Sequence, residues 1–205
     1  MLHDPTHLYE GELPPEKRKV ARAISAVTYP PFMGIVAMVA IALCLAEGDM
    51  VYWTMGLGLL FATVLPLVLA LLFSKLVGNG EGDIEDGRKR VVPMAVINLS
   101  YAAGAVAFHL IDAPDAAFLS MVAYLVNTTF CMVVSLKWKI SLHAMGVVGP
   151  ATALTISIWP WGLAVFLILP LVCWSRYYLR KHTPLQLALG ALFGTLLTAL
   201  VFFLL

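Results

Sequence analysis

Residues able to do phosphate chemistry gather in the stretch 174–186, which reads WSRYYLRKHTPLQ and joins two apolar runs. Four cations or potential cations stand directly before a predicted helix start: Arg176, Arg180, Lys181 and His182. Thr183 is a good N-cap, Pro184 suits the first helical position, and Gln186 falls where a capping box has Glu or Gln. The spacing therefore places His182 just outside a helix N-terminus, where free N–H groups and partial positive charge suit a phosphate.

The same stretch also fits a simpler interpretation, a positively charged loop between two membrane helices that is closed by an ordinary cap. Two further segments bear on the choice. One is Lys139-Ile140-Ser141-Leu142-His143, and the other runs from Asp86 through Arg88, Lys89 and Arg90 to Pro93. A phosphate site at these residues requires that the three segments meet in the folded chain, and this depends on the helices that carry them.

The composition indicates a membrane protein. The chain is 61% hydrophobic and 12% charged with a mean hydropathy of +0.90, and a soluble domain carries about twice that share of charge. Several apolar runs approach or exceed the ~20 residues that span a bilayer as a helix. We expect an all-α, polytopic bundle, and we interpret Cys44, Cys131 and Cys173 as packing residues because each lies within an apolar run.

About six to seven transmembrane helices are expected, over 31–45, 51–77, 91–111, 116–136, 143–158, 162–178 and 184–205. Residues 1–25 are expected to form an N-terminal cytoplasmic or interfacial segment, with 16–24 as a short basic helix on the membrane surface, and 26–205 a single domain. The pair Gly190 and Gly194 is typical of close helix packing. For Asn127-Thr128-Thr129, near mid-membrane, packing is favoured over substrate contact.

The distribution of charge is one-sided. All 13 Lys and Arg residues fall in the N-terminal segment or in and beside the links between helices two and three, four and five, and six and seven. The other links carry none and hold Glu47, Asp49, Asp112 and Asp115 instead. This is the positive-inside pattern, which predicts a cytoplasmic N-terminus. It also predicts that the three charged links converge on one face of the membrane.

In sequence order these three links resemble the signature motifs of the type 2 phosphatidic acid phosphatase superfamily, membrane lipid phosphatases related to vanadium haloperoxidases. The third motif is Ser-Arg, five residues, His, three residues, Asp, and Ser175, Arg176 and His182 match it at the same spacing. The second is Pro-Ser-Gly-His, of which Ser141 and His143 keep their positions. The first, Lys, six residues, Arg-Pro, is matched only by the basic cluster and Pro93. The resemblance covers about residues 86–195.

The resemblance implies a fold of transmembrane helices and a role for each matching residue. His182 would be the nucleophile that forms a phosphohistidine, and His143 would protonate the leaving alcohol. Arg176 would bind phosphate oxygens, with further contacts from five residues: Lys139, Ser141, Arg90, Arg88 and Ser175. Two histidines and an arginine suit this chemistry, because histidine exchanges protons near neutral pH and guanidinium binds phosphate bidentately.

Gln186 departs from the family pattern, because it stands where the family has the aspartate that orients the nucleophilic histidine. A neutral amide can hold one imidazole tautomer but adds no charge. Loss of the comparable aspartate in a serine protease costs about four orders of magnitude in rate. The alternatives are a slower phosphatase, one that recruits Asp83, Glu85 or Asp86, an inactive homologue, or a Gln186 that serves only the cap.

The expected partner is a lipid phosphate in the bilayer: phosphatidic acid, phosphatidylglycerol phosphate, or a polyprenyl phosphate or diphosphate. No cofactor, metal or nucleic acid is expected. A phosphotransferase that uses another alcohol as acceptor is an alternative, and so is a protein that binds anionic headgroups without chemistry. His143 and His182 favour the enzyme over the binding protein, because lipid binding needs only cations. A transporter is disfavoured because no inverted repeat is evident.

Overall fold

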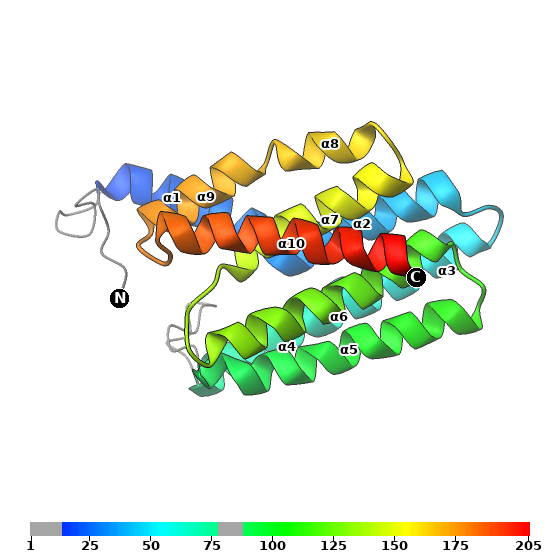
Figure 1. Cartoon of the computed structure of the whole chain (residues 1–205), viewed down its shortest axis with the longest axis horizontal. Helices are drawn as coiled ribbons and strands as arrows, with labels where there is room; N and C mark the ends of the chain where they lie inside the picture. The colour runs from blue at the N-terminus through cyan, green and yellow to red at the C-terminus, as the bar shows by residue number, and fades with distance from the viewer. Residues whose placement is uncertain (1–13, 78–87) are drawn as a thin grey trace.

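Helices account for nearly all of the computed structural model, which describes residues 14–77 and 88–205 (Figure 1). The all-α fold predicted from the composition is confirmed. The elements are α1 (Pro15–Val27), α2 (Pro30–Leu45), α3 (Met50–Gly58), the π-helical segment η1 (Leu59–Val64), α4 (Leu65–Val77), the 3₁₀ turn η2 (Arg88–Arg90), α5 (Val91–Leu110), α6 (Asp115–Ser135), α7 (Leu142–Ser157), α8 (Trp161–Phe166), α9 (Leu169–Tyr178) and α10 (Pro184–Leu204).

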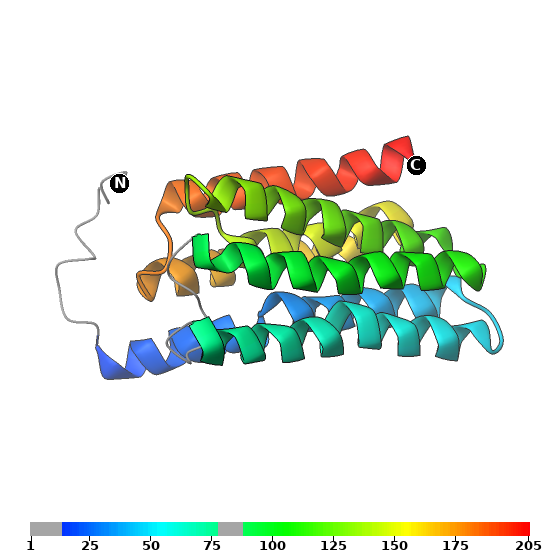
Figure 2. The same ribbon diagram turned by 90° about the horizontal axis from the view of Figure 1, so that it is seen from below.

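Five helical stretches among the described residues are long and apolar enough to cross a membrane: Met50–Leu76, Arg88–Leu110, Asp115–Ser135, Trp161–Tyr178 and Pro184–Leu204. A sixth span results if α1 and α2, which meet at a bend of 46°, are taken together. The long helices run side by side in both views (Figure 2). The prediction of a multi-pass membrane protein is thus confirmed. The remaining apolar helix, α7, has only 16 residues.

The predicted helix over 51–77 is continuous but changes its winding at η1. Pro66 cannot donate a helical hydrogen bond and its ring crowds the preceding turn, which favours the wider π winding just before it. Hydrogen bonds tie η1 to two neighbouring helices. Ser100 Oγ of α5 donates to the Phe61 carbonyl of η1 at 2.8 Å, and Thr63 Oγ1 of η1 donates to the Pro31 carbonyl of α2 at 2.9 Å.

The predicted helix over 162–178 is interrupted instead. It is divided into α8 and α9 by a turn at Leu167 and Ile168. Pro170 stands in the first turn of α9, where its missing N–H costs nothing, but it could not continue the hydrogen-bond ladder of α8. The α9 segment therefore takes its own direction, and it carries Ser175 and Arg176 at its end.

The predicted surface helix over 16–24 is part of α1, which buries Ala21 and Ser25 while its basic residues stay exposed. Those two residues belong to the face that packs on α9. The boundary expected between residues 25 and 26 lies inside α1, so the helix connects the N-terminal segment to the rest of the bundle.

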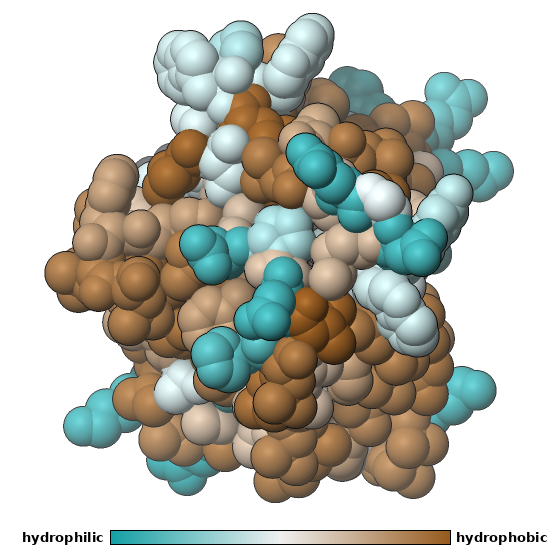
Figure 3. All heavy atoms as spheres, turned by 90° about the vertical axis from the view of Figure 1, so that its right-hand side faces the viewer, coloured by the Kyte–Doolittle hydropathy of each residue, from teal (hydrophilic) through white to brown (hydrophobic). Residues whose placement is uncertain are grey.

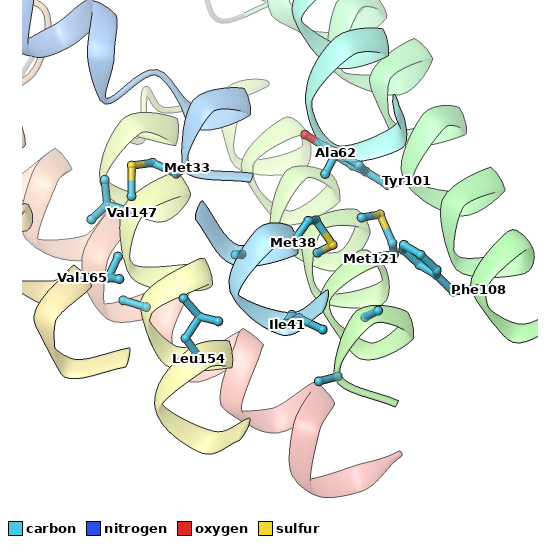
Figure 4. Packing of buried hydrophobic residues seen from close by; sticks show 14 of the residues in the cluster. Met33, Met38, Ile41, Ala62, Tyr101, Phe108, Met121, Val147, Leu154 and Val165 are labelled. Carbon is cyan, nitrogen blue, oxygen red and sulfur yellow. The ribbon is translucent and has the colours of Figure 1, made fainter. Parts of the chain in front are cut away.

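The apolar core lies where α2 meets α5, α6 and α7 (Figure 4). Met33, Met38 and Ile41 of α2 are almost fully buried there, against Met121 of α6 and Val147 of α7. Because every wall of this core is a helix surface, its packing holds the helices in the relative positions that the polar end requires.

Gly190 and Gly194 bring α10 against α7, as the sequence predicts. A Cβ atom added at Gly190 would lie 2.7 Å from the Ser141 carbonyl oxygen, and one at Gly194 would lie 2.6 Å from Val148 Cγ2. No other residue leaves room for so close a contact. The start of α7 is therefore held directly beside the first half of α10.

The described parts of the three charged links, including η2, lie at one end of the bundle, the left end in Figure 1. There α5, α7 and α10 begin and α4, α6 and α9 end. The opposite end, which faces the viewer in Figure 3, shows mainly apolar side chains with scattered hydrophilic ones. The convergence of the links that the charge pattern predicts is thus present in the fold.

Candidate functional site

A cavity of about 130 Å³ lies within the bundle and joins residues that are far apart in the sequence. Four of the residues that line it were singled out for phosphate chemistry: Arg90, His143, Arg176 and His182. Their exposed fractions are 5%, 7%, 4% and 2%, respectively. Among the described residues no Asp or Glu lines this cavity, so its charged side chains there are cationic. We call these four residues the cationic cluster.

Three helix N-termini meet at the cationic cluster. Arg90 is the N-cap of α5, His143 lies in the first turn of α7, and His182 directly precedes Thr183, the N-cap of α10. Each helix N-terminus presents unsatisfied N–H groups and partial positive charge. These partial charges disfavour the nearby guanidinium of Arg90 but favour an anion. The arrangement therefore suits a negatively charged ligand better than an empty cavity.

Hydrogen bonds at the start of α7 fix His143 relative to α10. Ser141 caps α7, because its Oγ accepts from the Ala144 N–H at 3.3 Å. Its own backbone N–H donates to the Gln186 carbonyl in α10, also at 3.3 Å. Ser141 is fully buried and does not line the cavity. Its observed contacts position the two helices that carry the histidines.

Gln186 contacts the imidazole of His182 and closes a capping box. Its Oε1 lies 3.2 Å from His182 Nδ1 and accepts from the Thr183 N–H at 3.1 Å, while Thr183 Oγ1 accepts from the Gln186 N–H at 3.4 Å. Since the Thr183 N–H can only donate, the amide must present its oxygen to this corner. His182 then donates from Nδ1, which leaves the imidazole lone pair on Nε2.

Helix α1 holds the Ser175-Arg176 pair. Ser175 Oγ donates to the Ala21 carbonyl at 2.8 Å, and Arg176 Nη1 donates to Ser25 Oγ at 2.9 Å. Ser175 is fully buried and does not line the cavity, so its contact is with α1. Sequence reasoning missed Ser25. The signal was its position four residues after Ala21, which puts both on one face of a helix.

Tyr29, at the junction of α1 and α2, is a second residue that sequence reasoning missed. It lines the cavity, and its ring lies 5.4 Å from the imidazole of His143, between centroids, at an interplanar angle of 58°. The aromatic ring therefore limits the orientations open to His143. No spacing in the sequence relates Tyr29 to a histidine 114 residues later, because the contact depends on the packing of α2 on α7.

Several predicted phosphate ligands are not brought to the cavity in the described part of the chain. Lys139 is half-buried and Arg88 is exposed, and neither lines it, so their roles stay predictions. Arg90 is the residue of the first basic cluster that does. The carboxylates considered as substitutes for the family aspartate, Asp83, Glu85 and Asp86, lie outside the described residues.

Asn127 has the packing role that the sequence favours, and it also lies at the cavity. Its Nδ2 donates to the Ala123 carbonyl at 2.9 Å and to Thr198 Oγ1 of α10 at 2.8 Å, which is the packing role that the sequence favours. Asn127 and Thr128 also line the cavity, together with Tyr101 and Tyr124. The cavity therefore continues from the cationic cluster to the middle of α6.

Comparison with models of known protein families, with curated proteins and with solved structures finds no match for this chain. The cationic cluster itself and the spacing of its residues in the sequence are therefore what indicates a function.

Proposed function

We propose that the protein is a membrane-integral lipid phosphate phosphatase that works through a phosphohistidine. The observation that carries this proposal is that two histidines and two arginines from three separate segments line one buried cavity in a bundle of apolar helices: Arg90, His143, and the pair Arg176 and His182. A site that only binds anions needs cations. Two histidines in addition supply the nucleophile and the proton donor that phosphoryl transfer requires.

Phosphate binding falls to the two guanidinium groups. Arg176 and Arg90 offer planar sets of N–H donors that match phosphate oxygens, and the N-termini of α5, α7 and α10 add partial positive charge. In phosphoryl transfer the charge on the equatorial oxygens is spread in the transition state, so fixed positive groups around it lower the barrier. The apolar remainder of the cavity suits a lipid tail.

In the first step, the Nε2 lone pair of His182 attacks phosphorus, and the bond from phosphorus to the ester oxygen breaks. The departing oxygen takes a proton from the imidazolium of His143. In the second step, water attacks the phosphohistidine and gives a proton to His143. The bond from phosphorus to Nε2 then breaks, phosphate leaves, and both histidines return to their starting states. Gln186 keeps the proton of His182 on Nδ1 throughout.

A specific observation favours a second candidate, headgroup binding with weak or no turnover. Gln186 is neutral, and among the described residues no carboxylate lines the cavity to stabilise the phosphoimidazolium of His182. The two candidates differ in one measurable respect. A phosphatase needs His182 for turnover, whereas a binding protein loses little affinity for lipid phosphate when His182 is replaced.

The test is phosphate release from purified protein in detergent micelles that contain a chelator. Phosphatidic acid, phosphatidylglycerol phosphate and polyprenyl phosphates serve as separate substrates. We expect release from at least one lipid, inhibition by orthovanadate, and loss of turnover in His182→Asn. The matched control is His109→Asn, since His109 is exposed and packs against Phe118 away from the cavity. Lack of release from every lipid, or turnover that survives in His182→Asn, would contradict the proposal.

A further inference from the structure

Helix α1 presents an apolar stripe on the side that does not pack on α9. Val20, Ala23 and Val27 are three and four residues apart, so they share one face of the helix. All three are exposed, Val20 by 53% and Val27 by 68%. The buried residues Ala21 and Ser25 lie on a different face. The helix therefore has one face for the bundle and another for a partner outside it.

Positive charge is concentrated on the rest of α1. Lys17, Arg18, Lys19 and Arg22 are all exposed, and Glu16 is the single acidic residue of this fully described helix. We call these four cations and the apolar stripe the α1 surface. An apolar stripe flanked by cations is the pattern of a helix that lies in the headgroup region of an anionic membrane.

The charges of α1 disfavour the helix unless an external anion offsets them. Its N-cap is Pro14, whose side chain has no hydrogen-bonding group. Lys17 and Arg18 stand in the first turn, where the helix dipole repels cations. Arg18 and Arg22 are four residues apart, so their like charges repel each other. Anionic headgroups beside the helix would remove each of these costs.

The length of α2 places the start of α1 at headgroup depth. Helix α2 has 16 residues, which span about 24 Å at about 1.5 Å per residue, whereas the hydrocarbon core is about 30 Å thick. Helix α1 continues α2 across a bend of 46°. Its last turn therefore completes the span, and its first turns extend beyond the neighbouring helices (Figure 2). The cations of α1 are thus at the level of the lipid headgroups.

Two hydrogen bonds connect the bundle-facing side of α1 to the segment that carries Arg176. Ser175 Oγ donates to the Ala21 carbonyl at 2.8 Å, and Arg176 Nη1 donates to Ser25 Oγ at 2.9 Å. Arg176 lines the cavity, whereas no residue of the α1 surface does. A change in the docking of α1 on α9 would therefore reach the guanidinium of Arg176 from outside the cavity.

We propose that the α1 surface binds anionic phospholipid headgroups of the membrane, and that this binding strengthens the hold of Arg176 on phosphate. These lipids are distinct from the substrate in the cavity. Lipid binding and docking on α9 both require the helical form of α1, because only a helix separates the two faces. Each therefore favours the other. The contact with lipid stands by itself, whereas its effect on phosphate binding rests on the proposed function.

A spin label at Val20→Cys reports the contact, in a background that lacks the three native cysteines. The protein is reconstituted in nanodiscs of phosphatidylcholine, with or without phosphatidylserine, which is anionic but is a diester and so not the proposed substrate. We expect phosphatidylserine to move the label into the lipid. The accessibility of the label to oxygen should then rise relative to its accessibility to a polar nickel chelate.

The double variant Lys17→Gln/Lys19→Gln should lose this response. Each lysine near an anionic surface contributes about fivefold to binding, so two contribute about 25-fold. Lys75→Gln/Lys137→Gln is the matched control, because both lysines are exposed, lie outside α1 and do not line the cavity. The control should respond to phosphatidylserine as the protein with all its lysines does.

Kinetics in the same nanodiscs tests the effect on Arg176. We expect phosphatidylserine to lower KM for phosphatidic acid by up to about tenfold, with a smaller change in kcat, because Arg176 is assigned to phosphate binding. In Ser25→Ala the label should still move into the lipid, but KM should no longer depend on phosphatidylserine. This variant separates the contact with lipid from its effect on the cavity.

A label response that is the same with and without phosphatidylserine overturns the inference, whether or not the protein is a phosphatase. A label that moves while KM stays unchanged overturns the effect on Arg176. If no lipid phosphate is hydrolysed, the proposed function fails, and the affinity for orthovanadate, measured from the rise in Tm, takes the place of KM. Tighter binding of orthovanadate with phosphatidylserine supports the inference, and equal binding contradicts it.

Discussion

At the residue scale, the question raised most sharply by the site is what Gln186 does for His182. The sequence left a capping role and a catalytic role open. In the structure one atom makes the contacts that both roles would use, since Gln186 Oε1 accepts from the Thr183 N–H and lies 3.2 Å from His182 Nδ1. The amide can therefore set the imidazole tautomer, but it cannot stabilise the positive charge that the proposed phosphoryl transfer would place on His182.

Replacement of Gln186 by Glu separates these two effects. Glutamate keeps the length and both contacts, and it adds a negative charge beside the imidazole and at a helix N-terminus, where the dipole favours it. We expect Gln186→Glu to keep or raise kcat. Gln186→Leu should lower kcat and, by loss of half of the capping box, should lower the free energy of unfolding by about 1 kcal/mol. Unchanged kcat in Gln186→Leu would limit Gln186 to the cap.

Ser25 gives a second prediction at this scale. Its Oγ accepts from Arg176 Nη1 at 2.9 Å, and both residues are buried. Ser25→Ala removes that acceptor, so we expect the guanidinium to lose its fixed position and KM for lipid phosphate to rise about tenfold. Ser25→Thr, which keeps the hydroxyl, should restore KM. Steady-state kinetics checks both variants, and an unchanged KM in Ser25→Ala would show that α1 does not position Arg176.

Sequence spacing anticipated part of this site. His182, His143, Arg176 and Arg90 were all named from short motifs and do line one cavity. The spacing could not distinguish Arg90 from Arg88, because both belong to the same basic run. Only the 3₁₀ turn η2 decides which of the two side chains is buried. Residues that contact the cluster from remote segments leave no local signal.

At the element scale, the close contact of α7 with α10 sets the separation of the two histidines. Gly190 permits it, since an added Cβ would lie 2.7 Å from the Ser141 backbone oxygen, which cannot rotate away. We expect Gly190→Ala to push α10 from α7, to lower Tm and to reduce turnover at least tenfold. Gly56→Ala is the control, because a Cβ there meets nothing within 4 Å. Wild-type Tm and turnover in Gly190→Ala would contradict this account of the helix contact.

The helices themselves were the most predictable part of the fold. Hydropathy and the Pro and Gly residues gave most boundaries to within one or two residues, because a bilayer requires long apolar helices and these residues end them. Changes of winding and breaks inside the helices were harder to predict from the sequence. The π winding of η1 and the turn between α8 and α9 both lie near prolines, yet a proline can also kink a helix without breaking it.

At the scale of the whole molecule, the charged links share one end of the bundle, and we predict that this end is cytoplasmic. Lys137, Arg180 and Lys181 do not line the cavity, so a role in the proposed site does not explain why they lie at this end of the bundle. The positive-inside rule explains this placement if the end is cytoplasmic. The consequence is that substrate is taken from the cytoplasmic leaflet.

Single cysteines test this orientation in intact cells, in a background that lacks Cys44, Cys131 and Cys173. Lys137 and Asp49 are both exposed, and they stand next to the end of α6 and the start of α3, which lie at opposite ends of the bundle in Figure 1. An impermeant thiol reagent should label Asp49→Cys and should spare Lys137→Cys until the cells are permeabilised. The reverse pattern would place the cationic cluster outside the cell and change the expected substrate pool.

The measurement that tests the central claim most directly is the identification of the phosphorylated residue during turnover. The protein is mixed with radiolabelled lipid phosphate in the presence of a chelator, quenched with alkali, which preserves phosphohistidine, and mapped by peptide mass spectrometry. We predict phosphate on His182 in the wild-type protein and none in His182→Asn. Phosphate on His143, or lipid hydrolysis without any phosphorylated histidine, would contradict the roles assigned to the cationic cluster.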